Sequence, residues 1–359
     1  MEHPSEKTQT HHSHHEHSNE HKKKKRMSKG TRVLLRVVIV IVVIALILAA
    51  TVLILDHMGK GNLTGGGDMS AIPEAELESA GRVRYKGQLY QYKKNITSIL
   101  LMGVDARTKE DATGEFDCAN QSDVNVLAVL DPNTKEITLI NVSRDAMVEM
   151  EVLDPYGNSK GTAKAQLALA YSYGDGANLS CELTRDAVSG LFFDLPIHAY
   201  ASIYMNGIAD LVGEVGGVTV TALETFGDFT QGQQVQLTRS NTENYIRYRA
   251  HDTEGNNQRM ERQKQVLIAM TKAMLSSVRK QPISILTIYD AVKRNVTTDL
   301  NTSSILYLGR TAAGMQLNEE MRKVVGESVL GAESHAEYLV DETALYELIL
   351  SVFYEPIDG

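Results

Sequence analysis

The sequence lacks several features that mark well-known classes of enzyme. It has no Walker A loop and no Gly-x-Ser-x-Gly turn, which excludes P-loop nucleotide hydrolysis and a nucleophile-elbow serine hydrolase. It has only two cysteines, Cys118 and Cys181, and their spacing is not that of a Cys-x-x-Cys metal site. It also has no internal repeat and no second long apolar run, so a solenoid and a multi-span membrane protein are both excluded.

Charge is unevenly distributed along the 359 residues, whose formal net charge is −9. Residues 1–36 hold nine of the 36 Lys and Arg residues but four of the 45 Asp and Glu residues, which leaves 27 basic and 41 acidic residues beyond them. A region this acidic is a poor general binder of nucleic acid, so no nucleic-acid partner is expected. Any anion must be bound locally, by clustered arginines or through a metal. Residues 1–21 carry seven histidines, which fit either weak metal binding or a disordered polar tail.

One apolar segment, Val37–Leu55, is nineteen residues long and contains a single polar residue, Thr51. At about 1.5 Å per residue it matches the hydrocarbon thickness of a bilayer. Cations precede it and Asp56 follows it, so the positive-inside rule places the N-terminus in the cytoplasm. We therefore predict four parts: a cytoplasmic His-rich and basic tail (1–36), a single-pass signal anchor in the membrane (37–55), an extracytoplasmic stem with room for one short helix (56–94) and a catalytic domain (95–359).

Periodicity in the catalytic domain predicts an α/β fold. Apolar runs at Ile96–Val104, Val124–Leu130 and Ile137–Val142 read as strands, and the Asp-Pro-Asn turn at 131–133 joins the last two as a hairpin. Helical patterns alternate irregularly with the strands, which indicates a mixed central β-sheet flanked by helices. The expected helices cover 166–173, 179–192, 205–215, 259–280, 282–293, 302–314 and 341–353.

The segment Tyr245–Gln263 concentrates arginines. Arg247 and Arg249 are two residues apart, so on a strand both side chains would share one face. Arg259, Arg262 and Gln263 follow with the spacing of one helical face. Four guanidinium groups near a helix N-terminus would suit a pyrophosphate. The alternative is a solvated basic face paired with scattered acids.

Three charged residues stand at expected strand ends, where α/β sheets place their ligands. They are Asp105, Asp123 and Arg144. Two carboxylates together with phosphate oxygens are a common way to hold Mg²⁺, and an arginine would neutralise the remaining charge. Taken singly, an aspartate in such a position is more often a helix cap or turn residue than a metal ligand.

Six segments then occur in a specific order, namely LMGVDAR (101–107), QSD (121–123), VSRD (142–145), AYSYG (170–174), GGV (216–218) and Tyr245–Gln263. In this order the chain resembles the LytR–CpsA–Psr phosphotransferases of Gram-positive cell walls. The resemblance is strong over 95–285 and extends weakly to the C-terminus. The cationic tail and single anchor also fit this family.

The resemblance implies a donor, a polyprenyl-pyrophosphate-linked glycan, and an acceptor, peptidoglycan. It implies Mg²⁺ or Mn²⁺ held by Asp105 and Asp123, and catalysis by these residues with Arg144 and Arg249. Pyrophosphate would be bound by Arg107, Arg144, Arg247, Arg249, Arg259 and Gln263. It also implies an apolar pocket for the polyprenyl chain, to which the apolar faces of 166–173, 179–192 and 264–275 could contribute. An acceptor hydroxyl would attack the glycan-proximal phosphorus and release polyprenyl phosphate; no general base is assigned.

Two departures from the family pattern concern single residues. The position where the family has a lysine holds Gln166, with Lys164 two residues earlier, and Gln121 stands where the family often has arginine. Two other functions stay open: a polyprenyl-pyrophosphate phosphohydrolase that uses water, and a membrane-bound regulator or glycan-binding module without turnover.

The cysteines also leave two readings, either two unrelated buried thiols or a bridge. Because both follow the predicted anchor, we expect a Cys118–Cys181 disulfide. A separate prediction concerns the arginines. If Arg249 points from a strand face at the phosphates, replacing Arg249 lowers activity more than replacing Arg262.

Overall fold

The computed structural model describes residues 76–358, apart from 80, 113–119, 250–254 and 332–334. Within these described ranges no helix is both long and apolar enough to cross a membrane. The predicted anchor, Val37–Leu55, and the His-rich tail lie outside them.

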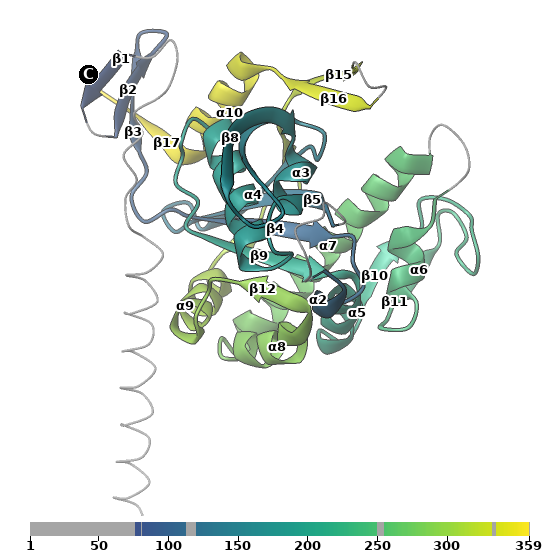
Figure 1. Cartoon of the computed structure of the whole chain (residues 1–359). Helices are drawn as coiled ribbons and strands as arrows, with labels where there is room; N and C mark the ends of the chain where they lie inside the picture. The colour runs from purple at the N-terminus through teal and green to yellow at the C-terminus, as the bar shows by residue number, and fades with distance from the viewer. Residues whose placement is uncertain (1–75, 80, 113–119, 250–254, 332–334, 359) are drawn as a thin grey trace, which may run out of the picture. The chain divides into compact units, whose positions relative to one another are not determined.

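A mixed sheet of seven strands forms the centre of the fold (Figure 1). Its strands are β12 (Val296–Thr298), β9 (Ala199–Tyr204), β4 (Thr97–Val104), β5 (Ser122–Asp131), β6 (Glu136–Val142), β13 (Gln316–Leu317) and β14 (Arg322–Lys323). They lie in the order β12-β9-β4-β5-β6, and β13 and β14 both pair with the outer edge of β6. β4 and β9 are parallel, as are β6 and its two outer partners, while the other pairs are antiparallel. The predicted mixed sheet and the β5–β6 hairpin are confirmed.

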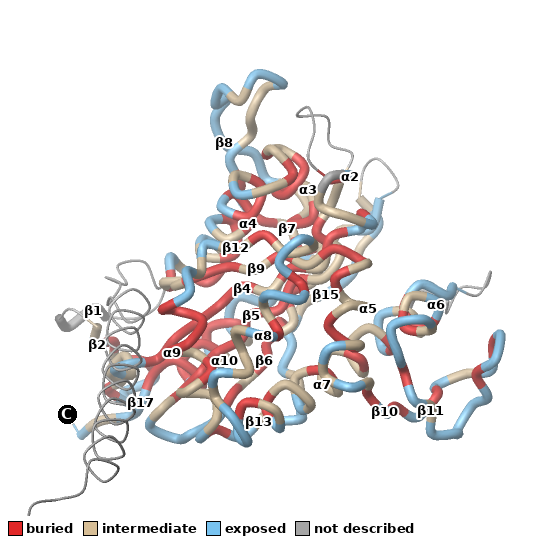
Figure 2. Tube along the Cα trace, turned by 90° about the horizontal axis from the view of Figure 1, so that it is seen from below, coloured by how far each residue is buried: buried red, intermediate tan, exposed pale blue. Residues whose placement is uncertain are grey.

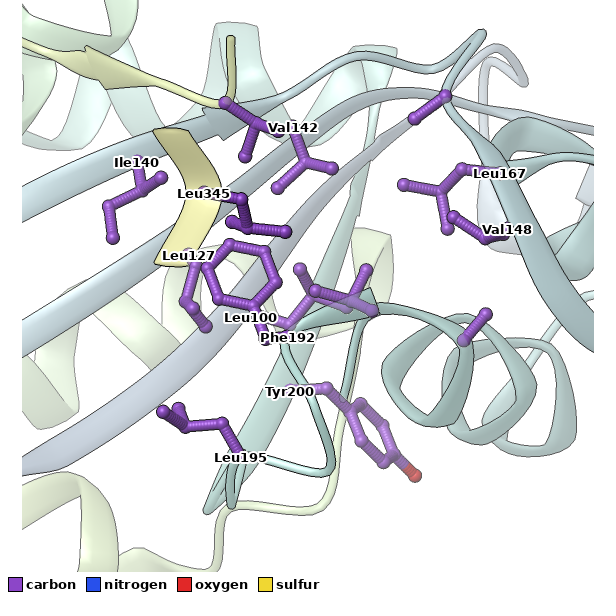
Figure 3. Close-up of a cluster of buried hydrophobic side chains, with 14 of the residues drawn as sticks. Leu100, Leu127, Ile140, Val142, Val148, Leu167, Phe192, Leu195, Tyr200 and Leu345 are labelled. Atoms are coloured by element: carbon purple, nitrogen blue, oxygen red, sulfur yellow. The ribbon is translucent and has the colours of Figure 1, made fainter. Parts of the chain in front are cut away.

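One face of the sheet is covered by α3 (Leu167–Ser172), α4 (Asn178–Leu191) and α10 (Glu342–Phe353). Leu100 and Leu127 point from the strands into this layer, where they pack with Phe192 and Leu345 in one buried cluster (Figure 3). The buried trace in Figure 2 follows the central strands and these helices. Asp341 begins α10 by accepting a hydrogen bond from the backbone N–H of Ala344, a standard helix cap.

The opposite face is covered mainly by the long helix α7 (Gly255–Lys280) and by α9 (Thr302–Ala313). Here Val126 and Leu139 pack with Leu275 of α7 and Tyr307 of α9. Because alternate strand residues are buried on opposite faces, β4, β5 and β6 are nearly continuous apolar runs, as their sequences suggested.

A second apolar cluster continues beyond this face, around α5 (Met205–Glu214), α6 (Thr242–Arg247) and α8 (Ser284–Val292). The hairpin of β10 (Val218–Thr221) and β11 (Gln234–Leu237) closes it. The predicted helices at 205–215, 282–293, 302–314 and 341–353 are each present to within a few residues at either end.

Residues 76–92 form strands where the sequence suggested a stem with a short helix. β1 (Glu76–Ser79), β2 (Arg82–Tyr85) and β3 (Gln88–Tyr92) build a small sheet with the C-terminal β17 (Tyr354–Ile357). Alternating burial in β2 and β3 explains the strands, because Val83, Tyr85 and Leu89 are buried. Two further hairpins were not predicted, β7 (Met147–Leu153) with β8 (Ser159–Gln166) and β15 (Gly326–Leu330) with β16 (Ala336–Val340).

Candidate active site

The centre of the site is an ion pair between Asp123 and Arg144. The register of the β5–β6 hairpin pairs Asn125 with Val142, and two further steps bring Asp123 opposite Arg144 just beyond the ladder. The Arg144 guanidinium donates through one nitrogen to Asp123 and through another to the side chain of Gln121. The exposed fractions of the Arg144 and Asp123 side chains are 30 % and 11 %, so the pair is largely withdrawn from water.

Asp105 lies next to this pair. It follows β4 directly, and its backbone N–H donates to the carbonyl of Gln121 at 3.3 Å. Burial raises the pKa of the Asp123 carboxyl above its ordinary value, the Arg144 charge opposes this, and the charge of Asp105 raises the pKa further. The two predicted metal ligands are therefore close enough to repel one another. Arg107 is exposed two residues beyond Asp105.

The predicted strand through Arg247 and Arg249 is wrong. Thr242, Tyr245 and Ile246 are all buried, which is the i, i+3, i+4 pattern of a helix, and α6 ends at Arg247. Arg247 forms an ion pair with Glu243 at 3.2 Å, on the exposed side of that helix. Arg249 is exposed just beyond α6. The two arginines therefore do not share the face of a strand.

The predicted helix after this segment is confirmed, and it begins earlier, at Gly255. Arg259, in its second turn, lies close enough to Asp123 that its charge lowers the pKa of that carboxyl. Gln263, one turn further, donates to the Ile246 carbonyl at 3.4 Å. Of the predicted pyrophosphate contacts, the structure thus brings Arg144, Arg259 and Gln263 to Asp123.

Arg262 has a structural role that its neighbours in sequence do not suggest. Its side chain is fully buried and donates to the backbone carbonyls of Tyr245, at 2.8 Å, and Tyr248. It also forms an ion pair with Glu224 and lies 5.0 Å from the ring centroid of Phe226. Arg262 therefore holds α6 and the following loop against α7 and does not face the site.

Two cavities meet at Asp123. The first, of about 210 Å³, is bounded by β5, β6, β14 and α7. We call it the polar cavity because charged and polar residues, among them Arg144, Ser143 and Asn141, stand beside the apolar residues of its wall. The second, of about 90 Å³, is apolar and lies between the sheet and helices α5 and α7, with Leu101, Ile203 and Met270 in its wall. The cavities share the residues Asp123, Val124, Val126, Gln263 and Leu267. The sequence did not predict the cations of the polar cavity other than Arg144, namely Lys264, Arg322 and Lys323.

One of the three segments expected to line a polyprenyl pocket borders the apolar cavity, and the pocket's role stays a prediction. Its wall includes Val266, Leu267 and Met270 from the predicted segment 264–275. The segments 166–173 and 179–192 do not contribute, because α3 and α4 pack on the opposite face of the sheet as ordinary core. Their apolar faces are explained by that packing alone.

Gln166 and Lys164 lie away from both cavities. The Gln166 amide donates to the carbonyl of Ala336, and Lys164 is exposed on β8 opposite Glu149. Neither residue therefore contacts the site in place of the family's lysine.

Cys181 is a free thiol, so the expected disulfide with Cys118 is not formed in this structure. It is fully buried on α4, and burial raises its pKa to about 12. The side chain of Ser202, on β9, opposes this rise in pKa. Cys118 lies outside the described residues.

The fold is α/β, and the ion pair of Asp123 and Arg144 lies where the apolar cavity and the polar cavity share a wall. A model of the LytR_cpsA_psr family matches residues 69–348, and the chain belongs to this family. The polyisoprenyl-teichoic acid–peptidoglycan teichoic acid transferase TagU of Enterococcus faecalis is 32 % identical over 240 residues, which cover 65 % of this chain and 71 % of that protein. TagU of Oceanobacillus iheyensis is 30 % identical over 250 residues, with 67 % and 69 % covered.

Solved structures support the same fold. Protein gbs0355 from Streptococcus agalactiae superposes with a TM-score of 0.57 at 24 % identity, covering 72 % of this chain and 86 % of that one. TagV of B. subtilis superposes with a TM-score of 0.53 at 23 % identity, covering 72 % and 95 %.

Proposed function

We propose that this protein transfers a glycan phosphate from a polyprenyl-pyrophosphate donor to peptidoglycan and so forms a phosphodiester. The observation that carries the proposal is the junction of the two cavities at Asp123 and Arg144. A donor of this kind has an apolar tail, two phosphates and a polar glycan in that order. The apolar cavity, the charged junction and the polar cavity follow the same order. The names of the related TagU proteins agree with this reaction.

In the proposed reaction a peptidoglycan hydroxyl oxygen attacks the phosphorus next to the glycan. A new P–O bond forms to the acceptor, and the bond from this phosphorus to the bridging oxygen breaks. The electron pair leaves with polyprenyl phosphate, and the hydroxyl proton goes to solvent or a base. Arg144 and Arg259 would stabilise the negative charge on the phosphate oxygens, which is the main contribution a protein makes to phosphoryl transfer.

Asp105 and Asp123 fit a hard divalent cation such as Mg²⁺ or Mn²⁺. The supporting observation is that Asp105 lies near the partly buried Asp123: burial raises the pKa of Asp123, the charge of Asp105 raises it further, and a bound cation would relieve this repulsion. Among the described residues no group of three or more metal-binding side chains occurs, so phosphate oxygens and water would complete the ligand set. When bound, the ion would withdraw charge from the phosphates.

We expect Asp105→Ala and Asp123→Ala to weaken Mn²⁺ binding by about tenfold or more, because each removes one of two carboxylate ligands. Mn²⁺ binding to the full-length protein in detergent would be followed by electron paramagnetic resonance, with and without donor. Asp186→Ala, an exposed carboxylate on α4 that pairs with Arg185, is the matched control. Unchanged Mn²⁺ affinity in both site variants, or activity that survives a chelator, would contradict a metal-assisted reaction.

The reaction itself is tested by product analysis with a donor radiolabelled in the glycan and with peptidoglycan as acceptor. Transfer predicts label attached to peptidoglycan through a phosphodiester. Free phosphorylated glycan would instead identify a phosphohydrolase, and unchanged donor would identify a binding protein without turnover.

We also propose that residues 37–55 anchor the chain with the catalytic domain outside the cell, since the cations lie on the N-terminal side of this segment. Protease added to intact protoplasts is expected to digest the chain beyond residue 60 and to leave a tag at the N-terminus intact. Protection of the C-terminal domain would show the opposite orientation.

A further inference from the structure

The polar cavity contains cations that the proposed pyrophosphate contacts leave unused. Lys264 comes from α7 and Lys323 from β14, on opposite sides of the opening. Lys264 has only a weak ion pair, 3.7 Å from Glu261, because the side chains of both partners, Lys264 and Glu261, are at least two-fifths exposed. Within the described residues no carboxylate lies in ion-pair distance of Lys323. The two carboxylates of the cavity wall, Asp123 and Glu261, pair with Arg144 and Lys264, so the charge of Lys323 is left without an acidic partner.

The register of β14 shows on which face of the strand each of its two cations lies. Lys323 pairs with Asn141 and Arg322 pairs with Ile140, in a parallel ladder. Ile140 is buried in the cluster under α3, α4 and α10, on the face away from α7. Since paired strand residues share a face, Lys323 lies on the α7 side with Asn141, whereas Arg322 starts from the other face of β14, although it too borders the cavity.

We propose that Lys323 and Lys264 form a second phosphate subsite, which binds a phosphate group in the glycan beyond the pyrophosphate. Lysine ammonium groups act as point charges that suit phosphate oxygens. This inference rests on the proposed function, because the donor's tail must occupy the apolar cavity for its glycan to enter the polar one. Lys264 and β14 border the polar cavity and not the apolar one, so a glycan that enters the polar cavity from the shared wall at Asp123 and Gln263 would approach them.

We assign the subsite to the donor and not to the acceptor, because the donor's tail, pyrophosphate and glycan follow the same order as the apolar cavity, the junction at Asp123 and the polar cavity. A peptidoglycan strand also carries anions, as carboxylates, but nothing in the geometry connects it to the apolar cavity. The proposal thus states a specificity: polymers with phosphate close to the linkage are preferred over otherwise identical neutral glycans.

The test uses the full-length protein in detergent and two synthetic donors with the same short prenyl pyrophosphate and the same neutral disaccharide. One donor carries a single additional glycerol phosphate unit. Affinities are measured without acceptor. We expect the wild type to bind the phosphate-bearing donor about five- to tenfold more tightly, a size typical of two solvent-accessible charge contacts. Lys323→Gln is expected to abolish this preference and to leave the neutral donor's affinity unchanged.

Lys272→Gln is the matched control, because it removes the same charge from an exposed lysine of α7 that does not border this cavity. It is expected to keep the preference. Equal loss in both variants would indicate a general electrostatic effect and would overturn the subsite, as would a wild type without preference. The subsite would also be overturned if Lys323→Gln weakened both donors alike, or weakened a peptidoglycan fragment instead. Product analysis separates this outcome from the function: transfer without preference refutes only the subsite, and preference without turnover refutes only the transfer reaction.

Discussion

Replacing Arg144 with Ala is expected to lower the rate of glycan transfer by about 10²- to 10³-fold, the scale of losing one positioned donor to transition-state charge. The guanidinium group of Arg144 donates to two partners, Asp123 and Gln121, so it is oriented before substrate arrives. Its removal also leaves the Asp123 carboxylate, 11 % exposed, without its counter-charge. Arg144→Lys keeps the charge but loses the fork, and we expect it to recover only part of the activity.

Arg185→Ala provides a control of the same residue type. The Arg185 side chain is 29 % exposed, close to the 30 % of Arg144, and it also pairs with an aspartate, Asp186. Initial rates with a labelled donor would be compared for both variants, with thermal unfolding as a check of the fold. Losses of similar size in the two variants would contradict a specific role of Arg144.

Replacing Arg262 with Met is expected to destabilise the fold by about 3–5 kcal/mol, the range found when one partner of a buried ion pair is removed. Arg262 is fully buried, and its loss leaves the Glu224 carboxylate and two backbone carbonyls without their donor. The sequence predicted a smaller effect on activity at Arg262 than at Arg249. The structure adds that the effect at Arg262 is on folding.

The midpoint of chemical denaturation measures this effect, with Arg294→Met, an exposed arginine of the turn 293–295, as the control. Adding Glu224→Gln to the Arg262→Met variant is expected to restore part of the stability, because no unpaired charge then remains buried. A single variant as stable as the control would mean that the buried pair contributes nothing.

The sequence predicted the parts of the fold that carry strong periodic patterns. β4, β5 and β6 are apolar runs ended by polar residues, and the antiparallel pairing of β5 with β6 follows from the short turn at 131–133. The long helix α7 was found because its apolar stripe extends over several turns. These elements place Asp105, Asp123 and Arg144, and this half of the site could therefore be predicted.

The remaining half depends on tertiary contacts that local patterns do not contain. Arg247 and Arg249 fit a strand by spacing, but the burial of Tyr245 and Ile246 on α6 decides for a helix. β14 has two residues, Arg322 and Lys323, and exists only because the edge of β6 is available for pairing. Lys323 consequently gave no sequence pattern, although the structure places it at the polar cavity.

The most direct measurement follows both reacting groups of one donor, with ³²P in the phosphorus next to the glycan and ¹⁴C in the glycan. If Arg144 and Arg259 hold the pyrophosphate for phosphoryl transfer, the two labels are expected to appear on peptidoglycan in equal amounts, and Arg144→Ala is expected to reduce both together. Recovery of ³²P in polyprenyl pyrophosphate, with ¹⁴C alone on peptidoglycan, would show that the sugar–oxygen bond breaks and would contradict the proposed mechanism.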